Sequence, residues 1–176
     1  MRMVQGAMAV VATMMLLGWF VGVRADEEKV PLDKLPKAVT EAVKKRFPKA
    51  ELLEASKEVV DKKTEYEVTI KNEGQKIDVT LTPEGVLLTL EKEITAKQLP
   101  MPVSKALKKS YPKAVYKIVE EVIKVKDGKE TLAYYEVLLV TADKKSVEVQ
   151  IEPTGKIISP TASGKEKKDD KKEPQQ

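Results

Sequence analysis

The stretch that decides the fold is LPKAVTEAVKKRFPKA, at residues 35–50, because the chain repeats it as LPMPVSKALKKSYPKA at residues 99–114. Both copies open with Leu-Pro and close with an aromatic residue followed by Pro-Lys-Ala. One constant offset, that from Leu35 to Leu99, relates the two copies from end to end. Repetition at a fixed spacing indicates that one structural unit occurs twice.

The correspondence continues further along the chain. Three later motifs of the first copy recur in order: Tyr66-Glu67-Val68 as Tyr135-Glu136-Val137, Ile77-Asp78-Val79 as Val147-Glu148-Val149, and Pro83-Glu84-Gly85 as Pro153-Thr154-Gly155. The offset is larger between Pro83 and Pro153 than between Leu35 and Leu99. The second copy therefore carries small insertions in its hairpins.

Each repeat begins with a pattern that predicts a short helix. Val39, Val43 and Phe47 recur every four residues, and Pro48 stops the helix after one apolar stripe. The second repeat shows the same pattern at Val103, Leu107, Tyr111 and Pro112. A helix this short is marginal alone, so the stripe must pack against another element.

Strands follow each helix. Tyr66, Val68 and Ile70 alternate with polar residues, which is typical of a strand with one buried face. Turn residues such as Asp127-Gly128 mark the hairpins. We expect an α+β fold of two tandem repeats, each one helix packed on a four-stranded antiparallel sheet. In the second repeat, Pro160 is expected to cut the last strand short after Ser159.

The ends of the chain differ from the repeats. Residues 1–25 hold an apolar run after Arg2 and end in Val23-Arg24-Ala25, which is typical of a cleavable export signal, although the run is also long enough for an uncleaved anchor. We expect a polar leader at 26–34, a first module at 35–94 and a second at 95–160. The charged residues 161–176 are expected to be a disordered tail, either a solvated spacer or a weak electrostatic contact.

Composition excludes several kinds of chemistry. The chain has no cysteine and no histidine, which removes thiolate catalysis, disulfides and the most common general base. Without Arg2 and Arg24 there are 30 basic and 28 acidic residues, interspersed along the chain, which argues against nucleic-acid binding. No phosphate loop, calcium loop or nucleophile elbow occurs. We expect no catalytic, cofactor-binding or metal-binding residues.

The repeated residues resemble one known family. Leu35-Pro36, Ala42-Val43, Phe47-Pro48-Lys49-Ala50, Tyr66-Glu67-Val68 and Pro83-Glu84-Gly85 together resemble the PepSY-like family, also called beta-lactamase-inhibitor-like. The resemblance covers about residues 35–158, one module per repeat. It implies a helix on a four-stranded antiparallel sheet, and an exported or envelope protein that binds or inhibits other proteins, such as peptidases or beta-lactamases. It implies no catalytic residues.

One strand breaks the symmetry of the repeats. In the second copy, the face opposite the expected core carries Tyr134, Glu136, Leu138 and Val140, whereas the first copy carries Glu65, Glu67, Thr69 and Lys71. Tyr134, Leu138 and Val140 are therefore a candidate partner surface. The alternative is that this face packs on the first repeat or on the linker.

Three functions remain open at this point. The leading one is a non-catalytic module, periplasmic or secreted, that binds or inhibits another extracytoplasmic protein. The alternative is an envelope module that binds or senses a ligand or cation, and the third is a hydrolase. The residues set neither the partner nor the oligomeric state.

We predict that export removes residues 1–25 and with them Trp19, the only tryptophan. Protein recovered from outside the cytoplasm should then show tyrosine emission alone. Tryptophan fluorescence from that material would show that the segment is retained.

Overall fold

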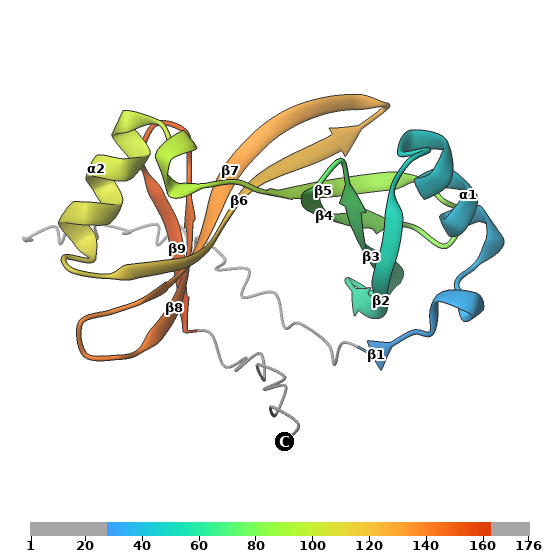
Figure 1. Cartoon of the computed structure of the whole chain (residues 1–176), viewed down its shortest axis with the longest axis horizontal. Coiled ribbons are helices and arrows are strands. Elements are labelled where there is room, and N and C mark those ends of the chain that lie inside the picture. Colours follow the sequence, from blue (N-terminus) through green and yellow to red (C-terminus); the bar gives the residue numbers. More distant parts are fainter. Residues whose placement is uncertain (1–27, 163–176) are drawn as a thin grey trace, which may run out of the picture.

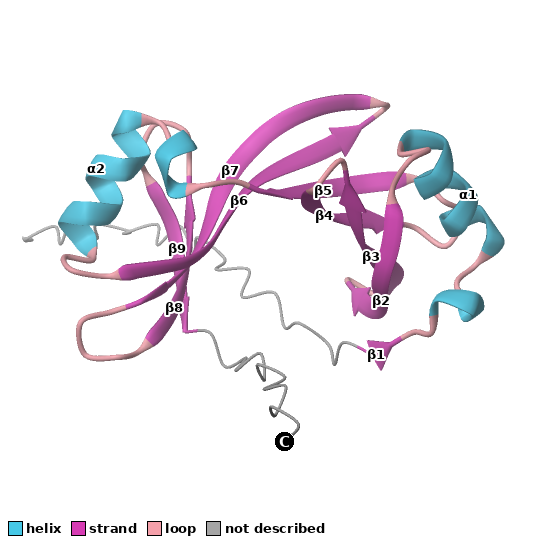
Figure 2. Cartoon of the chain, viewed as in Figure 1, coloured by secondary structure: helices cyan, strands magenta, loops and turns pink. Residues whose placement is uncertain are grey.

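A computed structural model describes residues 28–162, which form one nine-stranded antiparallel sheet with two α-helices (Figures 1 and 2). The strands lie in the sheet in sequence order. The elements are β1 (Glu28–Lys29), α1 (Lys37–Arg46), β2 (Glu51–Val60), β3 (Lys63–Asn72), β4 (Gln75–Leu81), β5 (Leu87–Glu93), α2 (Met101–Ser110), β6 (Val115–Lys126), β7 (Lys129–Val140), β8 (Ser146–Ile151) and β9 (Ile157–Ala162). Neither helix in this part of the chain is long and apolar enough to cross a membrane.

The α+β class and the two tandem modules predicted from the sequence are confirmed. The first module is α1 with β2 to β5, and the second is α2 with β6 to β9. The remaining strand, β1, belongs to neither module. It comes from the segment expected to be a polar leader, and it pairs with Ser56 and Lys57 of β2. The predicted signal segment 1–25 lies outside the described residues, as does the predicted tail beyond Ala162.

The two modules share two β-bulges as well as their elements. The pairing of β2 with β3 skips Leu53, and the pairing of β6 with β7 skips Lys117, its counterpart in the second repeat. Likewise β5 carries one extra residue at Leu88, and β9 carries one at the corresponding Ile158. The first pair has the offset of Leu35 to Leu99 and the second that of Pro83 to Pro153, so these bulges belong to the repeated unit. A further irregularity, at Ala133 of β7, occurs in the second module alone.

Each helix packs on its own half of the sheet, and both apolar stripes are buried as predicted. Val39 and Val43 of α1 are fully buried, and Phe47 after it is 7% exposed. Val103 and Leu107 of α2 are fully buried, while Tyr111 is half-buried. The strands contribute alternate residues to the two cores: Val68, Ile70, Ile77, Val79, Leu81 and Leu90 in the first, and Tyr135, Val137, Leu139, Val149 and Ile151 in the second.

The modules are joined through the sheet itself. β5 pairs with β6 from Thr89↔Lys124 to Glu93↔Glu120, and Ile123 of β6 packs into the core of the first module. Strands β6 and β7 have 12 residues each and are longer than β2 and β3, which have 10. Their hairpin extends toward α1 (Figure 1), where Arg46 Nη2 lies 2.8 Å from Glu130 Oε1. This fixes the relative placement of the modules, which the sequence left open.

The expectation that Pro160 cuts the last strand short is wrong. Strand β9 runs from Ile157 to Ala162, and Pro160 pairs with Val149 of β8. β9 is the edge of the sheet, so one side of its backbone has no neighbouring strand among the described residues. Proline, which lacks an N–H, is tolerated in edge strands because backbone groups on the open side of such a strand have no ladder partner.

The Pro-x-Gly turns are repeated because each glycine lies against a helix. Gly85 has φ +81°, and a Cβ there would meet the carbonyl oxygen of Ala38 in α1 at 2.5 Å. Gly155 has φ +88°, and its Cβ would meet the carbonyl oxygen of Pro102 in α2 at 2.7 Å. Each turn needs both the left-handed conformation and the missing side chain.

We predict that Gly85→Ala and Gly155→Ala each destabilise the protein by roughly 3 kcal/mol, from backbone strain plus displacement of the helix. The matched controls are Gly74→Ala and Gly128→Ala, which also have positive φ but open space around the new Cβ. These should cost only about 1–2 kcal/mol. Urea denaturation measures all four, and equal losses would contradict the proposed close packing of turn on helix.

Candidate functional site

Both helices cover the same side of the sheet. Val119 and Ile123 project from one face of β6, Val119 into the second core and Ile123 into the first. The sheet is bent, so the two helices lie at opposite flanks of the molecule although they cover the same face of the sheet (Figure 1). The opposite side, which we call the helix-free face, is therefore continuous from one module to the other.

The helix-free face holds buried polar residues. Strand register places them beside one another: Thr69 with Asp78, Thr80 with Thr89, and Glu120 with Glu136. Seven polar or charged residues are no more than 9% exposed, and all belong to this face: Ser56, Thr69, Asp78, Thr80, Thr89, Glu120 and Glu136. Such burial without a covering helix means that side chains from neighbouring strands of the bent sheet shield one another.

The residues predicted as a partner surface lie on this face. Tyr134, Leu138 and Val140 are half-buried, whereas the intervening Tyr135 and Leu139 are at most 4% exposed in the core. On the neighbouring strand β6, Val122 pairs with Tyr134 and Ile118 pairs with Leu138. The structure thus brings an apolar row together, with Glu136 inside it.

The linker between the modules runs on the other side of the sheet. The Ile94 N–H donates to the Val119 carbonyl at 2.8 Å, and the Ile94 side chain packs against the second core. The first module meets only one end of the apolar row, because Val122, the neighbour of Tyr134, pairs with Glu91 of β5. The far end, at Val140, pairs with Ser146 of β8.

A cluster of carboxyl groups lies where the modules join. Glu91 of β5, Glu120 of β6 and Glu136 of β7 each offer an oxygen, and these atoms lie within 4.8 Å of one another. The sequence does not reveal this cluster, because no spacing within the chain unites the three residues. Alternation places each one on the helix-free face, but the pairing of β5 with β6 was needed to bring them together.

Burial and like charges dominate the electrostatics of the cluster. Burial raises the pKa of Glu91 from 4.5 to about 8, with further contributions from Glu136, Glu67, Glu120 and Asp78. Glu91 therefore carries a proton at neutral pH.

The neighbouring groups are held by hydrogen bonds. Thr69 Oγ1 donates to Asp78 Oδ1 at 2.6 Å, and Lys76 Nζ donates to Asp78 Oδ2 at 3.1 Å. Gln150 Nε2 donates to Glu136 Oε2 at 3.0 Å. Three adjacent carboxyl groups in this setting can hold a shared proton or a cation that prefers oxygen ligands, such as Ca²⁺.

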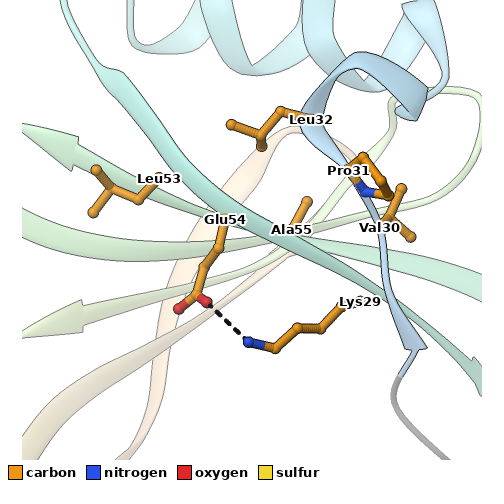
Figure 3. Close-up of a pocket in the computed structure, with 7 residues that line it drawn as sticks. All are labelled: Lys29, Val30, Pro31, Leu32, Leu53, Glu54 and Ala55. Atoms are coloured by element: carbon orange, nitrogen blue, oxygen red, sulfur yellow. Dashed lines mark ion pairs between the residues drawn. The ribbon is translucent and has the colours of Figure 1, made fainter. Parts of the chain in front are cut away.

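A surface hollow of about 340 Å³ lies elsewhere, between β2 and the segment that precedes α1 (Figure 3). Leu32 and Leu53 contribute its exposed apolar part, and Lys29 Nζ lies 3.9 Å from Glu54 Oε2 across it. It includes none of the predicted surface residues and none of the clustered carboxyl groups.

Comparison with family models finds one family, matched twice. The family described as "Putative beta-lactamase-inhibitor-like, PepSY-like" matches residues 18–89 and 89–159. This confirms the resemblance and the tandem arrangement. A comparison with curated proteins finds no match to this chain.

Solved structures share the fold at low sequence identity. A BLIP-like protein from Bacteroides fragilis is 20% identical, with TM-score 0.53, covering 73% of this chain and 88% of its own. A DUF2874 family protein from Bacteroides uniformis is 19% identical, with TM-score 0.58, covering 72% and 88%. A "putative periplasmic" protein from Bacteroides eggerthii is 17% identical, with TM-score 0.58, covering 72% and 87%. At these identities the likeness establishes the fold alone.

We predict that Glu91 makes stability fall as pH rises. Its pKa is raised in the folded state, so its contribution is complete below pH 4.5 and is lost as pH rises toward about 8. The free energy of unfolding should drop by roughly 2–4 kcal/mol between pH 5 and pH 8 through this group.

Glu91→Gln should flatten that slope, because glutamine resembles the protonated carboxyl and does not ionise. The control is Glu41→Gln, a change of the same kind on exposed α1, which should keep the slope. Urea denaturation at several pH values measures both variants. An unchanged slope in Glu91→Gln would show that Glu91 ionises normally.

Proposed function

Since this chain belongs to the PepSY-like, beta-lactamase-inhibitor-like family, we propose that it is a non-catalytic protein that acts outside the cytoplasm and binds another protein through its helix-free face. The family's description names an inhibitor, and a structural neighbour is described as BLIP-like. The absence of cysteine and histidine from the whole sequence supports binding rather than catalysis. The apolar N-terminal run supports export to the periplasm or beyond.

The observation that carries this proposal is the asymmetry of the helix-free face. The equivalent strands β3 and β7 present the same core residues, Tyr66 and Val68 matching Tyr135 and Val137. Their other faces differ, because β7 carries Tyr134, Leu138 and Val140 where β3 carries Glu65, Thr69 and Lys71. Folding alone requires the shared residues, so the half-exposed apolar row calls for a separate cause, and a protein contact supplies one.

The kind of partner follows from the family. An extracytoplasmic enzyme, such as a peptidase or a beta-lactamase-like enzyme, is the proposed target, with inhibition as the result of binding. A sheet face can inhibit by covering an enzyme's substrate entrance without any chemistry of its own. This matches a protein whose candidate site offers a half-buried apolar surface to a partner.

The carboxyl cluster favours a second candidate function, the binding or sensing of a cation. Glu91, Glu120 and Glu136 offer oxygen atoms close enough together to ligate one ion. Calorimetric titration with Ca²⁺ separates the two functions. Binding that disappears in Glu91→Gln and leaves Leu138→Glu unaffected would favour cation sensing.

We predict that Leu138→Glu abolishes partner binding while costing less than about 2 kcal/mol of stability, because Leu138 is only half-buried. The partner is first recovered from the cell-envelope fraction and identified, and its Kd is then measured with purified proteins. Leu53→Glu, which changes an exposed leucine on β2 in the same way, is the control and should bind normally.

A larger loss of stability in Leu138→Glu would show that the row packs inside the molecule, as the alternative interpretation has it. A variant that remains stable and binds every partner of the unaltered protein would remove the helix-free face from consideration as the binding surface.

A further inference from the structure

Negative charge gathers at the module junction on the helix-free face. Glu91 is surrounded there by four other carboxyl groups that raise its pKa, from Glu67 of β3, Asp78 of β4, Glu120 of β6 and Glu136 of β7. Five adjacent strands, β3 to β7, thus each contribute one carboxyl group. This concentration is unusual in a chain whose acidic and basic residues are otherwise interspersed.

Two lysines of the same face lie near these carboxyl groups, and one of them, Lys76, pairs with a member of the set, Asp78. Lys76 Nζ lies 3.1 Å from Asp78 Oδ2, and Lys124 Nζ donates to Thr89 Oγ1 at 3.2 Å. Gln150, which donates to Glu136, brings no charge. The groups that surround Glu91 are therefore mainly acidic, and the other ionisable residues of this face near the junction are Glu93, Lys76, Lys124 and Tyr134.

An apolar row lies directly beside this charge. Val122 pairs with Glu91 on one side and with Tyr134 on the other, so the ring of Tyr134 is two strands from the carboxyl group. Glu136 separates Tyr134 from Leu138 along β7, and Ile118 lies across from Leu138. A ligand that satisfies this surface must present positive charge and apolar area together.

We propose that the helix-free face at the module junction docks a segment of a partner protein that presents a lysine or arginine flanked by apolar side chains, and that this cation replaces a proton held among Glu91, Glu120 and Glu136. The inference rests on the proposed binding function and specifies the chemistry of the partner. The exchange balances, because one carboxyl group releases its proton to solvent as one cationic side chain enters.

Charge complementarity selects this partner over others. A segment with an acidic or neutral residue at the same place would leave the carboxyl groups desolvated and unbalanced, which disfavours binding. A bare metal ion would satisfy the oxygen atoms but would leave Ile118, Tyr134 and Leu138 exposed. A lysine or arginine on a protein segment meets both needs, since its long apolar stem can lie along Tyr134 while its head reaches Glu91.

The proton that Glu91 holds gives the interaction a pH dependence. At pH 6 the carboxyl group is protonated and must lose its proton before it can pair with a cation, so binding should be weak. Affinity should rise with pH by up to about tenfold per unit and level off above about pH 8, where the group is already ionised in the free protein.

The test uses a display library of random 12-residue peptides selected on the full-length protein. Enriched peptides should contain Lys or Arg beside an aromatic or aliphatic residue. In fluorescence anisotropy, Glu91→Gln should weaken their Kd by about tenfold, because one charge pair of about 1.4 kcal/mol is lost. Leu138→Glu should also weaken binding, whereas Glu41→Gln on α1 should not.

A double-mutant cycle identifies the pair directly. Replacing the basic residue of the peptide by norleucine should cost about tenfold on the unaltered protein and almost nothing on Glu91→Gln. Calorimetry at pH 6.5 in buffers of different ionisation enthalpy should show release of up to one proton with the unaltered protein and none with Glu91→Gln.

Three results would overturn the inference in distinguishable ways. Peptides that lack a basic residue yet depend on Leu138 would refute the cation requirement and leave the proposed binding function intact. The absence of any peptide dependent on Leu138 would remove both. Binding of Ca²⁺ to the protein alone, lost in Glu91→Gln and competing with peptides, would make a metal ion the occupant of the cluster.

Discussion

The pairing of β5 with β6 is the constraint on which the rest of the molecule depends. It runs over Thr89↔Lys124 to Glu93↔Glu120 and makes one sheet from two repeats. Because the ladder continues without a break in alternation between Val119 and Ile123, both helices must lie on the same side. The other side then becomes one continuous surface, which neither module could provide by itself.

That pairing also determines what is buried at the junction. Leu90 and Ile123 pair on the helix side and fill the first core, so the adjacent Glu91 must project to the helix-free face. There it meets Glu120 and Glu136, which the pairing of β6 with β7 holds side by side. The apolar contact stabilises the junction, and the carboxyl groups oppose it to an extent that depends on their protonation. Stability and charge are therefore linked at the place where the modules meet.

The sequence predicted what depends on local pattern. Val39, Val43 and Phe47 identified the first helix and its buried stripe, and the alternation through Tyr135, Val137 and Leu139 identified the core face of β7. The Pro-x-Gly motifs located the turns, although their cause, the approach of Gly85 to the Ala38 carbonyl, required the structure. The residues of the apolar row were also assigned to the correct face.

Features that depend on pairing between distant strands could not be predicted from the sequence. Pro160 was expected to end a strand, because the sequence does not reveal which strand is at the edge. The pairing of β1 with β2 rests on two residues, too few to produce a periodic signal. The carboxyl cluster unites Glu91 with Glu120 and Glu136 across the boundary between repeats, where similarity between the copies gives no information.

Equivalent positions in the two repeats carry different residues at this boundary, which makes the boundary chemically distinct. Glu136 corresponds to Glu67 in the repeat, and Glu120 corresponds to Ser56 by the offset that relates Leu99 to Leu35. In the first module, the neighbour of Ser56 on its outer side is Lys29 of the short β1, which brings a positive charge to that position. In the second module, the same side of Glu120 is occupied by β5, which brings Glu93 opposite it and Glu91 close by. Each repeat has its own core, but only at the junction does a strand of the other repeat, β5 with Glu91 and Glu93, lie beside the second copy. A surface of this kind arises from the tandem arrangement itself, and the substitutions that distinguish β7 from β3 lie next to it.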